Sequence, residues 1–540
     1  MQITEEHTKV LIVGAGPSGL MMAAQLLRYG IQPLIIDNKQ GPTSHSNALG
    51  VQARSLEIYR QLGIVDKVVN NGKQAQGLTF TENGKQVANV SLEGAGEGQT
   101  RFPYVLLYQQ YKNERLLLDY LTQHACPVFW ETSLVTLKQN AGYADVVLRN
   151  TEGEYPLRCD WVIGADGAHS TVRKQLNIPF KGDTYPHYFY LADVKIQASF
   201  LEGDYVQLYL GKNGFSGFFP MPEKDEYRII GSLPAAFTNQ DDVTLEQVLP
   251  HLADTTGSRA DVVHNNWFTT YKLHHRMAEN FRQQNCFLVG DAAHIHSPVG
   301  AQGMNTGLQD AYNLAWKLAG VVNHNLPENI LDSYAAERMP VARDLLNTTD
   351  RIFNIVMSQN WFLVFFKRMI LPRILHYVWS HKKTRDRGFR VISQIGISYR
   401  ESKINLHLSN AEKIKAGDCL PYLEIYDEKK QEETDLHAWC NKPGFTLIVM
   451  GRFDEMFLFN IAKWITNRFQ GLLNFYYLPP SGKNLAVFEA FETDPHREKA
   501  IIVRPDMHIG YMNDLVSIAM LDNYLQNVVG LGSMVKVNSE

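Results

Sequence analysis

The stretch KVLIVGAGPSGLMMAAQLLRYGIQPLIID, residues 9–37, decides the fold of the first part of this chain. Its apolar residues 10–13 predict a short strand that is buried on both faces. Glycines in G-x-G-x-x-G spacing come next, at Gly14, Gly16 and Gly19. Residues 20–29 then predict a helix, and residues 34–36 predict a second buried strand with Asp37 at its C-terminal end.

This strand, loop and helix predict a dinucleotide-binding site in a Rossmann-like fold. Gly14 permits the tight turn, Gly16 lets the backbone approach a pyrophosphate, and Gly19 lets the helix pack against the strand. The helix N-terminus offers N–H groups and a positive dipole to the phosphates, and Asp37 is placed to accept hydrogen bonds from a ribose. We therefore expect cofactor contacts from Gly14, Gly16, Pro17, Ser18, Gly19, Asp37, Asn38 and Lys39.

Composition argues against several other classes of protein. The 540 residues suggest two or three domains, and a net charge of −4 without a long charged run gives no indication of nucleic-acid binding. The N-terminus is polar and acidic and lacks the apolar core of a signal peptide. Residues 361–379 are the most apolar later stretch, but Lys367, Arg368 and Arg373 interrupt them, so they predict an amphipathic helix rather than a membrane span.

The cysteines and histidines predict neither a redox pair nor a metal site. The chain has 5 cysteines, and their scattered positions without a C-x-x-C motif fit a reducing cytoplasm. His294 and His296 stand two residues apart, but no third ligand lies nearby in the sequence, so we expect no metal.

Two further residues of the N-terminal part are candidates for cofactor contact. Residues 104–120 predict a strand followed by a helix, and Gln110 lies at their junction, where its side chain can reach a cleft. Arg54 lies near the start of a helix and faces either a phosphate or solvent.

Two later predicted strands each lead into a turn that contains an aspartate. Residues 161–163 predict a buried strand that ends in a turn containing Asp166 and Gly167. A strand that runs from Cys286 leads to Asp291, which is placed to bind a ribose or ribityl hydroxyl. The helix that begins near Asn305 directs its positive dipole and free N–H groups to where an anionic ring would lie.

The intervening residues, 184–272, show a different pattern of period-2 strands rich in aromatic side chains. Such a sheet forms either an ordinary core or, beside a cofactor domain, the wall of a pocket for a flat apolar ligand. The candidates for substrate contact are Tyr190, Gln207, Tyr209 and Phe219.

The motifs together resemble those of the single-component flavin-dependent aromatic hydroxylases, the class of para-hydroxybenzoate hydroxylase, phenol hydroxylase and the polyketide and antibiotic hydroxylases. The glycine loop ending at Asp37 is similar to their FAD fingerprint, and DWVIGADGAHSTVR (160–173) is similar to their Asp-Gly motif. FLVGDAAHIHSPVGAQGMNTGLQDAYNLAWKLAG (287–320) is similar to their Gly-Asp motif. Gln110, in Q-x-x-x-E-x-x-L spacing, matches a glutamine that contacts FAD in the family, and YAAERMP (334–340) matches a family helix.

The resemblance implies an FAD-dependent monooxygenase that uses NADPH or NADH and O₂ to hydroxylate a phenolic or polycyclic small molecule through a C4a-hydroperoxyflavin. Asp291 is then the ribityl ligand, and the loop that faces the flavin contains Pro298, Gly300 and Gln302, which are the candidates for the catalytic loop. Further cofactor contacts are implied for Arg54, Gln110, Leu134, Asp166, Gly167, Pro298, Gly303, Met304 and Asn305.

The domains implied by this class form an α/β chain with an inserted sheet. We expect a Rossmann-like FAD-binding domain from residues 1–183 and 273–345, a mixed β-sheet substrate domain from 184–272, and a helical linker from 346–404. IIVRPDMHIGY (501–511) is similar to the thioredoxin-like domain of the phenol hydroxylase branch, which predicts such a domain for residues 405–540. Because it lacks C-x-x-C, we expect a structural role or an oligomerisation surface, in a monomer or a homodimer.

The chain departs from the family pattern at several positions. Asp37-Asn38 stands where many relatives have Glu-Arg, and Asn47-Ala48 stands where many have Arg-Ala. Leu49 occupies the place of the aspartate base of phenol hydroxylase, so no side-chain base is assigned.

Two alternative functions stay open from the sequence. One is an FAD oxidoreductase of another reaction type, such as a halogenase, although the W-x-W-x-I-P signature of the halogenases is absent. The other is a non-catalytic flavoprotein that sequesters an aromatic ligand, which Leu49 in place of a base favours slightly.

Overall fold

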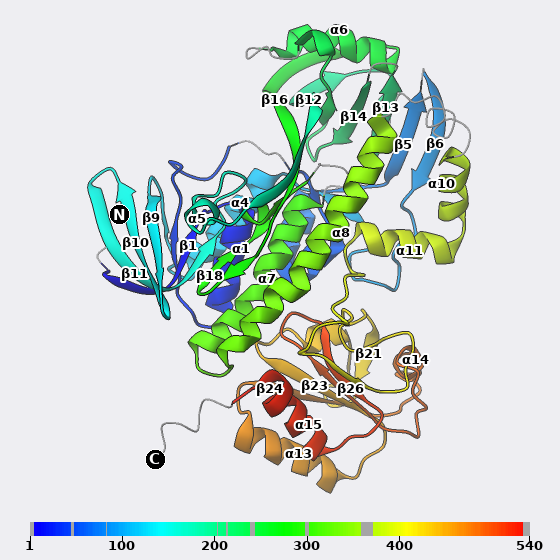
Figure 1. Ribbon diagram of the computed structural model, residues 1–540. Helices are drawn as coiled ribbons and strands as arrows, with labels where there is room; N and C mark the ends of the chain where they lie inside the picture. Colours follow the sequence, from blue (N-terminus) through cyan, green and yellow to red (C-terminus); the bar gives the residue numbers. More distant parts are fainter. Residues whose placement is uncertain are drawn as a thin grey trace.

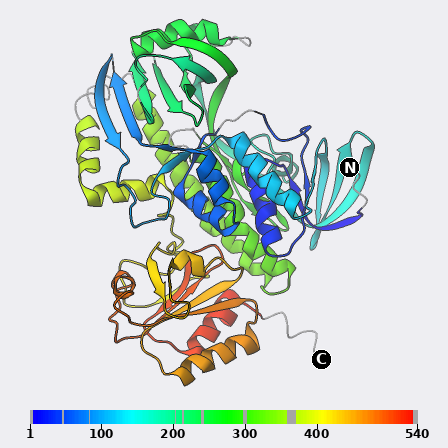
Figure 2. The same ribbon diagram turned by 180° about the vertical axis from the view of Figure 1, so that it is seen from behind.

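The computed structural model describes residues 5–44, 48–82, 84–201, 203–211, 214–237, 243–296, 302–357 and 371–532. These residues build two eight-stranded sheets and one five-stranded sheet, together with two smaller ones. In both views the second eight-stranded sheet and the C-terminal domain lie at opposite ends of the molecule (Figures 1 and 2). The predicted α/β architecture is confirmed.

The first sheet is built around β1 (His7–Val13), which pairs in parallel with β2 (Leu34–Ile36) and β11 (Gly153–Gly164). Residues 10–13 of β1, residues 161–164 of β11 and all of β2 are buried, as their continuous apolar sequence predicts. The remaining strands of this sheet are β8 (Val128–Phe129), β9 (Ser133–Asn140), β10 (Tyr143–Asn150), β17 (Arg282–Gln283) and β18 (Cys286–Leu288).

The carboxyl ends of the parallel strands meet at one edge of this sheet. The Gly14 N–H donates to the Ile36 carbonyl at 2.8 Å, and the Ala165 N–H donates to the Val13 carbonyl at 2.8 Å. Val289, which follows β18, donates to the Gly164 carbonyl at 3.0 Å. Ligands of open α/β sheets bind at this edge, so the backbone itself indicates where the site lies.

Helices cover the first sheet and continue toward the C-terminal part. The helix α7 (Gly303–Val322) packs beside α1 (Pro17–Arg28). The others are α2 (Ala53–Gln61), α3 (Val65–Asn71), α4 (Gln110–Gln123), α5 (Thr171–Gln175) and α8 (Asp332–Met357). Away from the first sheet, α10 (Leu371–Ser380) packs against residues 85–91 and against α11 (Lys382–Ile392) (Figure 1). A small sheet of β3 (Gly50–Val51), β4 (Lys73–Ala75) and β7 (Val105–Leu107) connects α2, α3 and α4.

The second sheet has the order β19-β16-β12-β15-β14-β13-β5-β6, and α6 (Leu245–Thr256) packs on one of its faces. Its strands are β5 (Gly77–Glu82), β6 (Lys85–Ser91), β12 (Phe180–Gln197), β13 (Tyr205–Gly211), β14 (Gly214–Pro220), β15 (Glu226–Ser232), β16 (Asp261–Ala278) and β19 (His294–Ile295). Residues 77–91 were assigned to the FAD-binding domain from the sequence, but β5 pairs in parallel with β13 and extends this sheet. The sheet of the predicted substrate domain therefore also includes residues 77–91, while the domain bounds stay a prediction.

The C-terminal domain has a five-stranded sheet of order β20-β26-β25-β23-β24. The strands are β20 (Leu406–Leu408), β23 (Phe445–Met450), β24 (Leu473–Leu478), β25 (Lys499–Val503) and β26 (Ile509–Asn513). The hairpin of β21 (Glu424–Asp427) and β22 (Glu432–Asp435) and the helices α12 (Leu436–Trp439), α13 (Glu455–Arg468), α14 (Leu485–Ala490) and α15 (Ile518–Asn523) complete it. Its likeness to thioredoxin stays a prediction.

The apolar stretch of residues 361–379, for which the sequence predicts an amphipathic helix, lies partly beyond the described residues. Residues 361–370 are outside them, whereas the rest of the stretch forms most of α10. Among the described helices, none has the length and apolar composition that crossing a bilayer requires.

Candidate active site

The glycine loop after β1 has open space beside Gly16, whereas backbone atoms pack closely against Gly14 and Gly19. A Cβ on Gly14, whose φ is +107°, would lie 2.3 Å from the Ala165 carbonyl oxygen, and a Cβ on Gly19 would lie 1.9 Å from that of Gly14. A Cβ on Gly16 would meet no described protein atom within 4 Å, and Gly16 lines the cavity described below. Backbone packing therefore requires two glycines, while the third leaves the open space that a pyrophosphate needs.

Asp37 fixes the same loop from the end of β2. It is 6% exposed, and its Oδ2 accepts a hydrogen bond from the Ala15 N–H at 2.7 Å. Its Oδ1 accepts from the Lys39 N–H at 2.9 Å. A carboxylate has about four lone-pair positions, so two remain for ribose hydroxyls.

A single cavity of about 2240 Å³ opens at the carboxyl edge of the first sheet and extends under the second sheet. A drug-sized ligand needs roughly 300–1,000 Å³, so this space is large enough for a dinucleotide and a second molecule. The residues expected at the site that line it are Gly14, Gly16, Pro17, Ser18, Asp37, Asn38, Lys39, Gln110, Leu134, Asp166, Gly167, Asp291, Gln302, Gly303 and Met304. Their contact with a cofactor stays a prediction.

Asp166 and Gln110 shape the cavity wall through their own hydrogen bonds. The Asp166 carboxylate accepts from the Ser170 hydroxyl at 2.5 Å and from the Thr171 N–H at 2.6 Å, and burial raises its pKa. Ser170 also caps α5, as predicted. The Gln110 Oε1 accepts from the Ala48 N–H at 3.1 Å and thereby positions the segment that leads to Leu49.

Asp291 follows β18 and opens onto the cavity. Desolvation by the surrounding protein raises its pKa, although His294 opposes this. The His294 ring is not directed to a metal, because its Nε2 lies 2.7 Å from the Asp310 carboxylate. Arg338 binds the other oxygen of Asp310 at 2.7 Å. No group of three possible metal ligands occurs among the residues that the structure describes.

The match to a known family begins at the first residue of β1. Residues 7–349 match a family model described as an FAD binding domain. The chain belongs to this FAD-binding family. FAD, which the resemblance implies, is therefore its cofactor, and the open space at Gly16 fits a dinucleotide.

The relatives in this FAD-binding family include aromatic monooxygenases. Pentachlorophenol 4-monooxygenase of Sphingobium chlorophenolicum is 32% identical over 77% of this chain and 76% of its own length. The 6-methylpretetramide 4-monooxygenase of Streptomyces rimosus is 34% identical over 65% of this chain, and the alignment spans 63% of that relative. The predicted membership of the flavin-dependent aromatic monooxygenases is confirmed.

Solved structures show the same fold over nearly the whole chain. An anhydrotetracycline hydroxylase from Streptomyces rimosus has a TM-score of 0.77 and 24% identity, over 97% of this chain and 100% of that chain. An aklavinone-11 hydroxylase in a complex with FAD and aklavinone has a TM-score of 0.79 and 22% identity, over 98% and 100%.

Two residues that were expected to contact FAD have other partners. The Arg54 guanidinium donates to the Glu57 carboxylate at 2.9 Å and to the Asp506 carbonyl at 2.8 Å, so it is directed to the C-terminal domain and not to a phosphate. The Asn305 side chain is buried and connects α7 to the start of α2, where its Oδ1 accepts from the Gln52 N–H at 2.9 Å. Pro298 and Gly300 lie outside the described residues.

Three of the four residues expected at the substrate lie on the face of the second sheet that is turned away from the cavity. In β13, Val206 and Leu208 line the cavity, whereas Gln207 and Tyr209 do not. Successive side chains of a strand point to opposite faces, so the prediction was displaced by one residue. Tyr190 is also excluded, because it packs with Tyr209 and Phe218 in the cluster that includes residues of α6. Phe219, on β14, does line the cavity.

The cavity walls contributed by β5, β6, α10 and α11 are not among the site residues predicted from the sequence. Leu78 and Phe80 of β5 alternate with polar residues, a pattern that was available as a signal for a strand with one buried face. The other missed residues include Val90, Leu92, Trp379, Lys383 and Asp386.

Proposed function

We propose that this flavin monooxygenase uses NADPH or NADH and O₂ to hydroxylate a phenolic or polycyclic aromatic molecule. The observation that supports this most strongly is the continuity of one cavity from the glycine loop to the apolar face of the second sheet. Bound FAD supplies the redox chemistry, while the chain supplies binding, orientation and electrostatics. The names of pentachlorophenol 4-monooxygenase and 6-methylpretetramide 4-monooxygenase support an aromatic substrate.

The chain's own groups at the first sheet have separate roles in this proposal. The N-terminus of α1 begins at Gly16 without a side-chain cap, so its N–H groups are available for the pyrophosphate. Asp37 binds the adenosine ribose, and Asp291 binds the ribityl chain. The N-terminus of α7 also lacks a side-chain cap at Gln302, and it favours negative charge on a ring placed beside it.

The substrate side of the cavity is apolar near its centre and polar at one end. Leu49 packs with Ala75, Leu107 and Val206, all buried and all hydrocarbon, so residue 49 cannot remove a proton from a substrate. At the polar end, the cavity is lined by charged residues of α11, namely Lys383, Asp386, Arg387 and Arg390. Ligand sites combine apolar walls with a few polar groups that fix orientation, so we infer a substrate with a flat apolar body and polar substituents.

We also propose that the protein works in the cytoplasm. All five cysteines are free thiols, and four of them are buried. Free thiols without disulfides are the usual state in that reducing compartment.

The proposed reaction predicts that the substrate controls flavin reduction. Turnover without an aromatic target would consume NADPH and release peroxide, and a conformational step that waits for substrate avoids this loss. We expect slow NADPH oxidation by the enzyme alone, strong stimulation by the correct phenolic or polycyclic compound, and one oxygen atom from ¹⁸O₂ in the product. Stopped-flow spectroscopy measures the rates of NADPH oxidation with and without the compound, and mass spectrometry measures the oxygen in the product. Oxygen derived from water, or a product without added oxygen, would contradict the monooxygenase reaction.

The two faces of the second sheet give a matched pair of variants. Phe219→Ala removes a ring from the cavity wall, and losing the burial of a phenylalanine side chain against substrate is worth about 1.5–3 kcal/mol. We expect kcat/KM for the aromatic substrate to fall about 10- to 100-fold, mainly through KM. Tyr209→Phe is the control, because Tyr209 faces away and donates to the Phe200 carbonyl at 3.0 Å. Similar KM values for the two variants would place the substrate elsewhere.

A further inference from the structure

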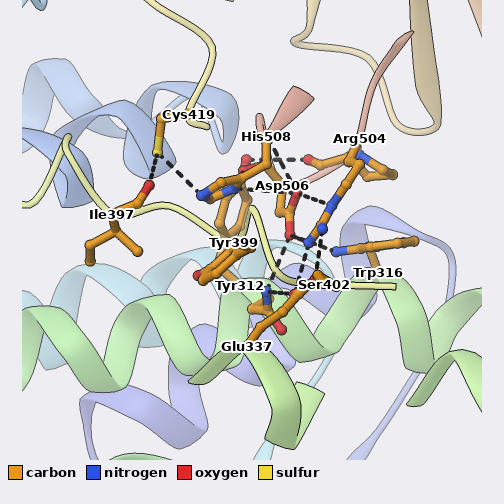
Figure 3. Close-up of polar contacts among 12 residues, drawn as sticks. Tyr312, Trp316, Glu337, Ile397, Tyr399, Ser402, Cys419, Arg504, Asp506 and His508 are labelled. Carbon is orange, nitrogen blue, oxygen red and sulfur yellow. Dashed lines mark hydrogen bonds and ion pairs between the residues drawn. The ribbon is translucent and has the colours of Figure 1, made fainter. Parts of the chain in front are cut away.

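A cysteine, a histidine and an aspartate meet where the C-terminal domain contacts the FAD-binding domain (Figure 3). The Cys419 Sγ lies 3.2 Å from the His508 Nε2. The other ring nitrogen, Nδ1, lies 3.5 Å from the Asp506 Oδ1 and 3.1 Å from the Asp506 carbonyl oxygen. A nucleophile within hydrogen-bond reach of a base, with a third group that orients the base, is the arrangement of an activated thiol.

The charges around this cluster favour its ionised form. Burial opposes ionisation of the Cys419 thiol, but Arg54 of α2 and His508 outweigh it and lower the pKa, with Glu57 of α2 acting in the opposite direction. Burial also disfavours the charged imidazole, yet Cys419 and Asp506 raise the pKa of His508 to about 9. Tyr399 stacks on the His508 ring with centroids 4.2 Å apart and so fixes its orientation.

Cys419 differs from the other cysteines in access as well as in charge. It is half-buried and lines the large cavity. Cys126, Cys159, Cys286 and Cys440 are all buried. Burial raises the pKa of Cys286 and of Cys440 to about 12, so these thiols are inert near neutral pH.

We propose that Cys419 and His508 form a thiolate–imidazolium pair that reacts with hydrogen peroxide at the wall of the flavin cavity. The sulfur attacks one peroxide oxygen, an S–O bond forms and the O–O bond breaks. The departing hydroxide takes the imidazolium proton and leaves as water, so sulfur is oxidised by two electrons to a sulfenic acid and peroxide is reduced. The proposed function enters only as a source of peroxide, which forms when flavin reduction is not followed by hydroxylation.

The direct test adds hydrogen peroxide to the FAD-loaded enzyme without NADPH and traps sulfenic acid with dimedone for mass spectrometry. We expect the adduct at Cys419 and none at Cys440. Cys419→Ser should abolish it, and Cys440→Ser, the matched control, should retain it. Because no turnover is involved, failure of this test is distinct from failure of the proposed hydroxylation. Absence of the adduct from Cys419 would overturn the proposal.

A second measurement addresses the role of His508. Iodoacetamide should alkylate Cys419 at pH 7 about tenfold or more faster than an ordinary thiol, because an unperturbed cysteine is only a few per cent thiolate there. His508→Gln should remove this advantage. If that variant does not fold, the pH dependence of Cys419 alkylation in the wild-type enzyme tests the ion pair. We expect an alkylation rate that is nearly constant from pH 7 to 9. A rate that instead rises through about pH 8.5, as for a free cysteine, would refute the ion pair.

Discussion

Replacing Glu337 with glutamine is expected to lower the free energy of unfolding by about 3–5 kcal/mol, the usual effect of breaking a buried ion pair. Glu337 lies on α8 and is 3% exposed. Its carboxylate accepts from the Arg504 guanidinium at 2.7 and 2.9 Å and from the Lys317 ammonium at 2.7 Å. Figure 3 shows this carboxylate beneath Arg504 and Asp506 of the C-terminal domain.

The size of this effect follows from the two buried cations that Glu337→Gln would leave without their anionic partner. Burial opposes ionisation of Glu337, but Arg504 and Lys317 outweigh it and hold its pKa well below its usual range. A neutral amide leaves these two buried cations with Asp506 as the remaining nearby anion among the described residues. A carboxyl whose pKa is depressed on folding stabilises the protein above its unfolded pKa, about 4.3 for glutamate, and this contribution disappears as the pH falls through the folded pKa.

Urea denaturation followed by tryptophan fluorescence measures the change, since Trp316 donates to Asp506 at 3.1 Å within the same cluster. Glu328→Gln is the matched control. Its carboxylate pairs with Arg282 at 2.9 Å but is 65% exposed, so its loss should change stability by less than about 1 kcal/mol. If both variants unfold at the same urea concentration, the cluster does not hold the C-terminal domain in place.

The sequence was sufficient for the parts of the site that depend on local pattern. The strand, glycine loop and helix of residues 9–37 are local in sequence, and the edge where Asp37, Asp166 and Asp291 meet follows from the ends of parallel strands. Period 2 alone does not say which face of a strand is buried against a cavity when both faces are apolar or aromatic. That is why Tyr209 was chosen in place of Leu208.

Contacts between residues far apart in the chain could not be predicted from the sequence, for a different reason. Nothing in residues 77–91 indicates that they join β13, more than a hundred positions later, because pairing partners are set by tertiary packing. Arg54 is similar: its partner is a backbone carbonyl at Asp506, in a domain whose docking surface has no motif. Such contacts also created the Cys419 and His508 pair, which no spacing in the sequence predicts.

Replacing Gly16 with alanine should separate cofactor binding from folding. Gly16 has φ −78° and ψ −176°, a conformation that alanine adopts without strain, and its Cβ would meet no described protein atom within 4 Å. We therefore expect the FAD-free protein to keep its stability within about 0.5 kcal/mol, as for most substitutions away from packed features. The added methyl group would occupy space that the pyrophosphate requires, beside N–H groups that bind it.

The expected loss is about a hundred- to ten-thousandfold in FAD affinity. Overpacking a tight contact costs about 1–3 kcal/mol, and a weakened hydrogen bond to a charged group adds about 1.5–3 kcal/mol. Titration of the FAD-free protein with FAD, followed by flavin fluorescence, measures the affinity, and thermal unfolding of the same sample measures stability. Gly19→Ala is the contrasting variant, since its Cβ would lie 1.9 Å from the Gly14 carbonyl oxygen and should destabilise the protein even without cofactor. An unchanged FAD affinity in Gly16→Ala would show that the pyrophosphate does not lie at the N-terminus of α1.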